Sequence, residues 1–206
     1  MITIGLTGPS GAGKGELSVL FEKHNIPVLD TDKVSRIVCG KNMPCTLELA
    51  GAFGGNILMP DGSLDRKKLA QTVFANENRE SYLPKLNEIT HRYILEYADM
   101  WLEEKKKEGY ASAVVDAPVL FESGYDKKCD FIIGVLADKN KRIRRITERD
   151  NIDTELAQKR INAQKSDRFY KENCSLILYN NEGIEELEKI ALPYIMALEK
   201  GIIPTF

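Results

Sequence analysis

A glycine-rich loop constrains this chain more than any other sequence feature. Gly8-Pro9-Ser10-Gly11-Ala12-Gly13-Lys14 has the spacing G-x-x-x-x-G-K, and it stands between the apolar run Ile2–Thr7 and a helical pattern. Glycines permit backbone turns that a Cβ would forbid, so successive N–H groups and the start of the helix can face phosphates. Lys14 adds an ammonium for the β- and γ-phosphates. The alternative is an ordinary glycine-rich turn, but the lysine in register and the preceding strand favour a phosphate-binding loop.

The next position departs from the usual pattern. Gly15 stands where such loops commonly carry the Ser or Thr whose hydroxyl binds Mg²⁺. Adenylate kinases also have G-K-G here, and Mg²⁺ tends to keep several waters. ATP therefore remains the expected nucleotide, with the protein ligands of Mg²⁺ left open. The residues expected to bind ATP in this segment are Gly8, Gly11, Ala12, Gly13, Lys14, Gly15 and Glu16.

Alternating strand and helix patterns predict an α/β fold. Five short apolar runs predict buried parallel strands: Ile2–Thr7, Pro27–Asp30, Ala111–Asp116, Phe131–Ala137 and Ser175–Tyr179. Helices are predicted over Lys14–Lys23, Asp32–Val38, Arg66–Phe74, Arg79–Glu108, Lys139–Arg149, Thr154–Gln164 and Ile184–Glu199. The long interval 31–110 predicts a helical lobe inserted into a core formed by residues 1–30 and 111–206.

Carboxylates follow two of the predicted strands. Asp30 ends the second strand and Asp32 follows it, and Asp116 ends the third. Because ligands of open parallel sheets bind beyond the carboxyl ends of the strands, these residues are candidates for the site. In a strand-like D-x-D both side chains share one face, so one could orient an acceptor or a metal while the other takes a proton. The alternative is that Asp30 or Asp32 caps the next helix, or that Asp116 serves a turn.

Composition excludes several other classes. Lys+Arg 29 against Asp+Glu 31 gives a net charge of −2, so no overall attraction to nucleic acid or to an anionic membrane is expected. Cys39, Cys45, Cys129 and Cys174 show no C-x-x-C pairing, which predicts reduced thiols rather than zinc or disulfides. The N-terminus does not resemble a signal peptide, and no apolar run approaches the ~20 residues of a membrane span. We therefore expect a cytoplasmic protein.

Several further motifs occur in an order and spacing that resemble the dephospho-coenzyme A kinase family along nearly the whole chain. The matching segments are Gly5–Gly15 for GLTGGIGSGKS, Asp30–Arg36 for DAD-x-x-x-R, Asp61–Leu69 for DG-x-LDR-x-x-L, Leu86–Ile94 for L-x-x-I-x-HP-x-I, Asp116–Glu122 for DAPLLFE, Arg145–Asp150 for R-x-x-x-RD and Arg160–Gln164 for R-x-x-x-Q. The sequence departs from the family at Gly15, at Arg92 in place of proline, and at Tyr179-Asn180-Asn181 in place of D-N-x-G.

The resemblance implies a fold and a reaction. The fold would be a P-loop NTPase with a five-stranded, Rossmann-like parallel sheet, an inserted lobe that binds the acceptor, and a lid from about Arg142 to Arg168. The reaction would be transfer of the ATP γ-phosphate to the 3′-hydroxyl of dephospho-coenzyme A. Protein partners are not implied.

The resemblance also implies roles for individual residues. The expected catalytic residues are Lys14, Asp32 and Arg149, and Arg145 and Arg149 of the lid would contact ATP. Arg142 and Arg144 are expected to form a solvated helix face. Asp32 or Asp116 would serve Mg²⁺, directly or through water. The acceptor would contact Asp32, Arg36, Asp65, Arg66, His91, Asp116, Pro118 and Leu120.

Two other functions share the same loop. A nucleoside monophosphate kinase is suggested by G-K-G, but D-G-x-L-D-R and Asp116–Glu122 favour the coenzyme A precursor. A GTPase switch would need N-K-x-D late in the chain, and Asp138-Lys139-Asn140-Lys141 does not fit that pattern.

Overall fold

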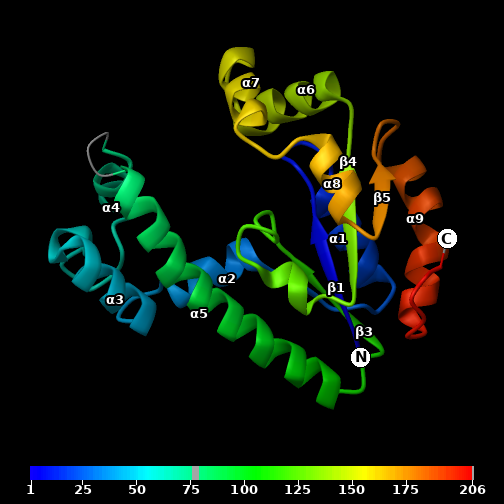
Figure 1. The fold of residues 1–206 in the computed structure, drawn as a ribbon, viewed down its shortest axis with the longest axis horizontal. Helices are drawn as coiled ribbons and strands as arrows, with labels where there is room; N and C mark the ends of the chain where they lie inside the picture. Colours follow the sequence, from blue (N-terminus) through cyan, green and yellow to red (C-terminus); the bar gives the residue numbers. More distant parts are fainter. Residues whose placement is uncertain (76–78, 206) are drawn as a thin grey trace. The chain divides into compact units, whose positions relative to one another are not determined.

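A computed structural model describes residues 1–75 and 79–205 (Figure 1). Its centre is a five-stranded parallel sheet with the strand order β2-β3-β1-β4-β5. The strands are β1 (Ile2–Thr7), β2 (Val28–Asp30), β3 (Ser112–Asp116), β4 (Phe131–Leu136) and β5 (Leu176–Tyr179). The protein is thus an α/β protein with the P-loop nucleotide-binding fold, as predicted.

The strands form where apolar residues can be buried on both faces of the sheet. Every residue of β3 and β4 is buried, and Ile4 of the central β1 lies opposite Val114 on one side and Phe131 on the other. One side of the sheet packs against α1 (Lys14–Lys23) and α9 (Ile184–Glu199), which contribute Leu17 and Ile195 among others to the main core. This core holds the loop that follows β1 on a rigid base.

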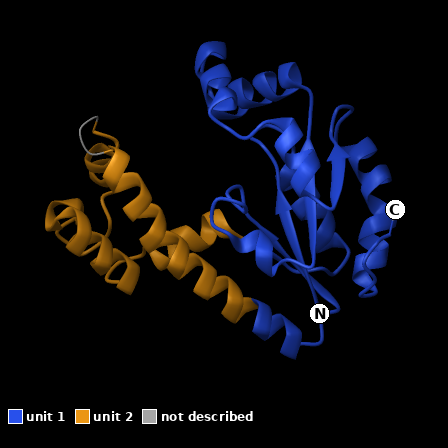
Figure 2. Cartoon of the chain, in the orientation of Figure 1, with its two compact units in different colours: residues 1–29, 102–206 blue, residues 30–101 orange. Residues whose placement is uncertain are grey.

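The chain forms two compact units (Figure 2). Unit 1 comprises residues 1–29 and 102–206, and unit 2 comprises residues 30–101. The remaining helices of unit 1 are α6 (Lys139–Asp150), α7 (Thr154–Asn162), α8 (Asp167–Asn173) and the short 3₁₀ helix η2 (Tyr125–Lys128). Unit 2 contains α2 (Thr31–Val38), α3 (Pro44–Phe53), η1 (Gly55–Ile57), α4 (Arg66–Phe74) and most of α5 (Arg79–Lys107).

The five predicted strands are confirmed, each with ends within one residue of the predicted ones. Two helices, α3 and α8, were not predicted. In α3, Pro44 stands at the first helical turn, a position that proline favours, and Gly51 weakens the pattern. The short α8 is capped by Ser166, whose hydroxyl accepts from Phe169 N at 3.3 Å. Among the described residues, no helix combines the length and apolar character needed to cross a membrane.

Candidate active site

The loop after β1 adopts a conformation that requires glycine. Gly8 has a φ of 150° and Gly13 a φ of 98°, backbone conformations that other residues rarely adopt. A Cβ on Gly8 would collide with the carbonyl oxygen of Val135, and one on Gly13 would collide with the side-chain amide of Asn180. Ala12, within the loop, is fully buried. The glycine spacing in the sequence therefore reflects close backbone packing against β4 and the end of β5.

Lys14, the last residue of this loop, forms an ion pair with Asp116. Lys14 Nζ donates to Asp116 Oδ1, and Ser18 Oγ donates to the other carboxylate oxygen at 2.7 Å. Asp116 is only 5% exposed at the end of β3. Hydrogen bonds to both oxygens hold the carboxylate in one orientation. Ser18, one turn along α1 from Lys14, is a site residue that the sequence pattern did not indicate.

Gly15 and Glu16 occupy the first turn of α1. No heavy atom lies within 4 Å of the position that a Cβ on Gly15 would take. Glu16 Oε2 accepts a hydrogen bond from Asn180 Nδ2 at 2.7 Å. Within residues 1–75 and 79–205, no group of three His, Cys, Asp or Glu side chains is arranged to hold a metal ion. The oxygens beside Lys14 come instead from Asp116 and Ser18, and hard oxygen donors in small number suit Mg²⁺ that keeps its waters.

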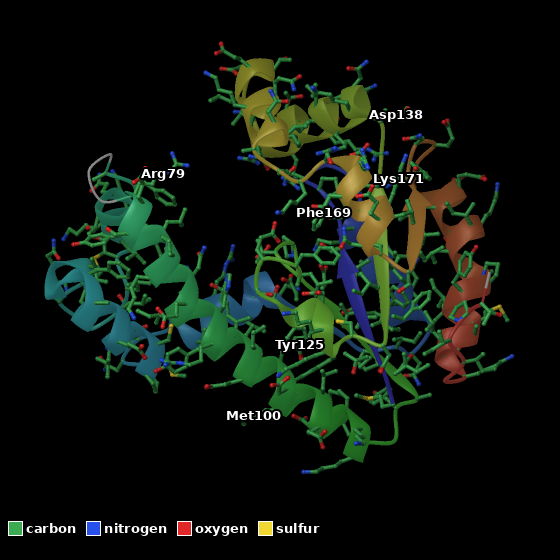
Figure 3. All side chains as sticks on the ribbon, viewed as in Figure 1. Arg79, Met100, Tyr125, Asp138, Phe169 and Lys171 are labelled. Atoms are coloured by element: carbon green, nitrogen blue, oxygen red, sulfur yellow. The ribbon has the colours of Figure 1, made fainter. Side chains whose placement is uncertain are left out.

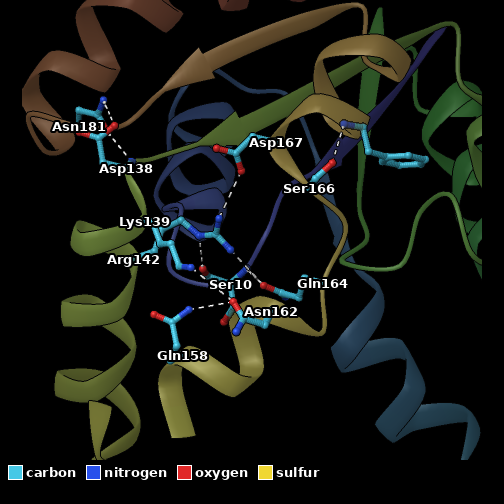
Figure 4. Close-up of polar contacts among 11 residues, drawn as sticks. Ser10, Asp138, Lys139, Arg142, Gln158, Asn162, Gln164, Ser166, Asp167 and Asn181 are labelled. Atoms are coloured by element: carbon cyan, nitrogen blue, oxygen red, sulfur yellow. Dashed lines mark hydrogen bonds and ion pairs between the residues drawn. The ribbon is translucent and has the colours of Figure 1, made fainter. Parts of the chain in front are cut away.

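The prediction that Arg142 belongs to a solvated helix face is wrong. Arg142 is 4% exposed, and its Nε donates to the carbonyl of Ser10 at 3.0 Å (Figure 4). Its other nitrogens donate to Gln164 at 3.2 Å and Asp167 at 3.4 Å. Gln164 Oε1 also accepts from Ser10 N at 3.1 Å. Arg142 shares the buried face of α6 with Ile146, one turn later, and fastens α6 to the phosphate-binding loop. Arg144 is exposed and pairs with Glu148, as expected.

Arg149 and Arg145, the two predicted nucleotide contacts of α6, differ in their partners. Arg149 donates to the carboxylate of Asp150 at 2.7 and 3.0 Å and reaches Ser10 Oγ at 3.5 Å. Hydrogen bonding from Arg149, with Arg160 as a second partner, lowers the pKa of Asp150 to about 2. Arg145 donates to the carbonyl of Gly11 and to Asn180 Oδ1, both at 3.3 Å. The structure therefore brings both arginines to the loop, and their contact with ATP stays a prediction.

A pocket of about 370 Å³ lies beside Arg145. It is lined by Lys141, Arg144, Arg145, Glu148 and the turn Asn181–Gly183 that precedes α9. Asn181 fixes this turn to the start of α6, because its side chain accepts from Asp138 N at 2.8 Å and donates to Asp138 Oδ1 at 3.1 Å (Figure 4). Its position next to Arg145 makes this pocket a candidate for the nucleotide.

In the segment after β3, the two predicted acceptor residues Pro118 and Leu120 differ in burial. Pro118 is partly exposed, whereas Leu120 is fully buried and contacts Gly5 of β1. Phe121 packs edge-on against Phe169 of α8, with ring centroids 5.0 Å apart; Phe169 is labelled in Figure 3. This contact ties the segment that follows Asp116 to the end of the basic region 142–168.

In unit 2, Asp30 is a helix cap. Its Oδ1 accepts from Asp32 N at 2.9 Å and from Lys33 N at 3.2 Å, and α2 begins at Thr31. The expectation that Asp30 and Asp32 share one face of a strand is therefore wrong, because the chain turns into the helix between them. Asp32 lies in the first turn of α2, and its side chain is exposed. Arg36 follows one turn later and is also exposed.

The other predicted acceptor residues of unit 2 lie on α4 and α5. Asp65 caps α4 by accepting from Lys68 N at 3.0 Å, and this backbone hydrogen bond lowers the pKa of its carboxyl. Arg66, the first residue of α4, is exposed, and His91 is partly buried on α5. Arg92 pairs with Glu48, which also accepts from Tyr93 Oη at 2.8 Å. The departure from proline at Arg92 thus supplies an ion pair between α3 and α5.

Comparisons with known proteins bear on this site. The sequence pattern of the dephospho-CoA kinase family matches residues 2–186. A dephospho-CoA kinase from Corynebacterium glutamicum is 35% identical over 91% of this chain and 92% of its own length, and one from Fusobacterium nucleatum is 36% identical over 92% and 94%. The crystal structure of TT1252 from Thermus thermophilus matches with a TM-score of 0.77 and 26% identity, covering 95% of this chain and 96% of its own.

Proposed function

The chain belongs to the dephospho-CoA kinase family, and we propose that it transfers the γ-phosphate of ATP to the ribose 3′-hydroxyl of dephospho-CoA, giving coenzyme A and ADP. One structural observation carries the proposal. The Lys14 ammonium, at the end of the glycine loop, is held in place by the buried carboxylate of Asp116. This is where a phosphoryl group held by the loop would need positive charge.

Three cations of unit 1 would stabilise the transferring phosphoryl group. Lys14 would meet the β- and γ-phosphates, and Arg145 and Arg149 approach the same loop through Gly11 and Ser10. Phosphoryl transfer depends mainly on such positioning and charge stabilisation. In our proposal the segment 142–168 acts as a lid over ATP.

Unit 2 would bind the acceptor. Asp32 would orient the 3′-hydroxyl and take its proton, since a carboxylate within hydrogen-bond reach of a positioned hydroxyl can act as a general base. The exposed guanidinium groups of Arg36 and Arg66 suit the diphosphate of dephospho-CoA. Asp65 and His91 of unit 2 also belong to the proposed acceptor set. Its remaining members, Asp116, Pro118 and Leu120, belong to unit 1, and Leu120 would act through packing because it is buried.

Mg²⁺ would enter with the nucleotide. When bound, it would neutralise charge on the phosphate oxygens. Because Gly15 offers no hydroxyl, we propose that Asp116 serves the ion through water, with Asp32 as the other candidate. Ser18 would keep the Asp116 carboxylate oriented toward Lys14 both with and without bound Mg²⁺.

The test compares acceptors. ADP release is measured with ATP and either dephospho-CoA, AMP, CMP or UMP, and Lys14→Met is the control for transfer that depends on the loop. We expect much faster turnover with dephospho-CoA. A preference for a nucleoside monophosphate would overturn the assignment and favour a nucleoside monophosphate kinase.

A further inference from the structure

Asn180 is a fully buried polar residue that immediately follows β5. Its backbone is fixed, because Asn180 N donates to the carbonyl of Leu136 at 2.8 Å. Its side-chain amide faces two groups of opposite charge. Nδ2 donates to Glu16 Oε2 at 2.7 Å, and Oδ1 accepts from Arg145 Nη2 at 3.3 Å. A single amide therefore stands between a carboxylate of α1 and a guanidinium of α6.

This position leaves Arg145 with neutral partners. Among the described residues, its hydrogen bonds go to the Gly11 carbonyl and to the Asn180 amide. The neighbouring arginines of α6 are different, since Arg149 pairs with Asp150 and Arg142 with Asp167. Arg145 also lines the 370 Å³ pocket, so a ligand in that pocket would lie beside this arginine.

The same amide packs against the phosphate-binding loop. A Cβ on Gly13 would collide with Asn180 Nδ2 and would lie 2.9 Å from Glu16 Oε2. Asn180 thus contacts the loop backbone and orients Glu16, while its oxygen orients Arg145. The amide offers a donor to the anion and an acceptor to the cation from one side chain.

We propose that Asn180 is a positioning residue that keeps Glu16 and Arg145 from pairing, so that Arg145 retains its charge for the phosphates of ATP. The proposal rests on the proposed function in one respect, that ATP is the ligand of this loop. It assigns a role that depends on charge separation and not on packing alone. Without the amide, Glu16 and Arg145 would form a direct ion pair that competes with the nucleotide.

The test measures the Kd of ATP by calorimetry, without dephospho-CoA, for Asn180→Ala, Glu16→Gln and the double variant. Asn180→Ala should weaken ATP binding by about tenfold, because Arg145, paired with Glu16, would lose one charge-assisted hydrogen bond to the phosphates of ATP. The double variant should recover the affinity of Glu16→Gln alone, because no carboxylate remains to pair with Arg145. If the double variant binds ATP as weakly as Asn180→Ala, or if Asn180→Ala binds like the parent, the proposal is wrong.

Asn180→Asp, which keeps the shape of the side chain, covers the case in which Asn180→Ala does not fold. Its carboxylate would pair with Arg145, so ATP binding should weaken, and Glu16→Gln should not relieve the defect. Normal ATP binding, or relief by Glu16→Gln, would refute the proposed charge separation. Transfer to dephospho-CoA by the parent protein is measured separately. A parent that binds ATP but does not phosphorylate dephospho-CoA would refute the proposed function without bearing on Asn180.

Discussion

Gly15→Ser restores the hydroxyl that most phosphate-binding loops carry after the lysine. The structure permits the change, since no heavy atom lies within 4 Å of the Cβ position and Gly15 is not among the residues with positive φ. Gly15 is the second residue of α1, so the serine oxygen would stand at the helix start beside Lys14. The substitution should therefore offer Mg²⁺ an additional oxygen without displacing any protein group.

We expect Gly15→Ser to change both the stability of the protein and its Mg²⁺ requirement. Serine is more favourable than glycine in a helix by about 0.5 kcal/mol, which for a domain of this length raises the Tm by about 1–2 °C. A direct oxygen ligand should lower the half-saturating Mg²⁺ concentration about three- to tenfold, equivalent to about 0.7–1.4 kcal/mol. ATP affinity should stay unchanged or improve modestly.

The assay is a Mg²⁺ titration of turnover at saturating ATP, together with thermal unfolding. Gly15→Ala is the matched control, because it removes the same backbone freedom and adds no oxygen. Alanine should raise the Tm at least as much as serine while leaving the Mg²⁺ requirement unchanged. If Gly15→Ser needs as much Mg²⁺ as Gly15→Ala in a folded protein, the water-mediated account of the metal is refuted.

Three further predictions address other parts of the site. Lys14→Ala should reduce both ATP affinity and turnover, and thermal unfolding checks that the fold survives; an unfolded variant would point to a structural role. Asp32→Asn should lower turnover by about 10² to 10⁴ with ATP affinity nearly intact, and equal loss of ATP binding in calorimetry would contradict its role as a base. Because the pKa of Asp150 falls from 3.8 to about 2 in the folded protein, its pairing with Arg149 and Arg160 stabilises the fold above about pH 4 and is lost as the pH falls toward 2. Asp150→Asn should flatten this acid limb in thermal unfolding between pH 2 and 5, and an unchanged limb would exclude Asp150 as its source.

The parts of the site that are local in sequence could be predicted, and those that depend on distant contacts could not. The loop of Gly8–Lys14 has fixed spacing, and the strands are continuous apolar runs, so both were found. The contact of Ser18 with Asp116 joins residues 98 positions apart, and that of Asn180 with Glu16 joins residues 164 apart. Neither residue belongs to a pattern that identifies its partner.

Errors arose where one residue type serves two roles. An arginine in a basic helix reads as solvated, yet Arg142 is buried because its side of α6 faces the loop. An aspartate after a strand can be catalytic or can cap the next helix; the sequence left both roles open for Asp30, and the structure shows the cap of α2. In both cases the role of the residue depends on what its side chain faces. The residue types of the segment do not determine that direction, and the packed structure does.

The strand order has a consequence for how the protein is made. The glycine loop is synthesised first, but β1 lies at the centre of the sheet, between β3 and β4, and Asn180 reaches the loop from beyond β5. A ribosome must therefore translate almost the whole chain before the loop acquires the contacts that shape it, and contacts of such long sequence separation form slowly. Nascent chains halted before residue 176 should not retain immobilised ATP, whereas released full-length chains should.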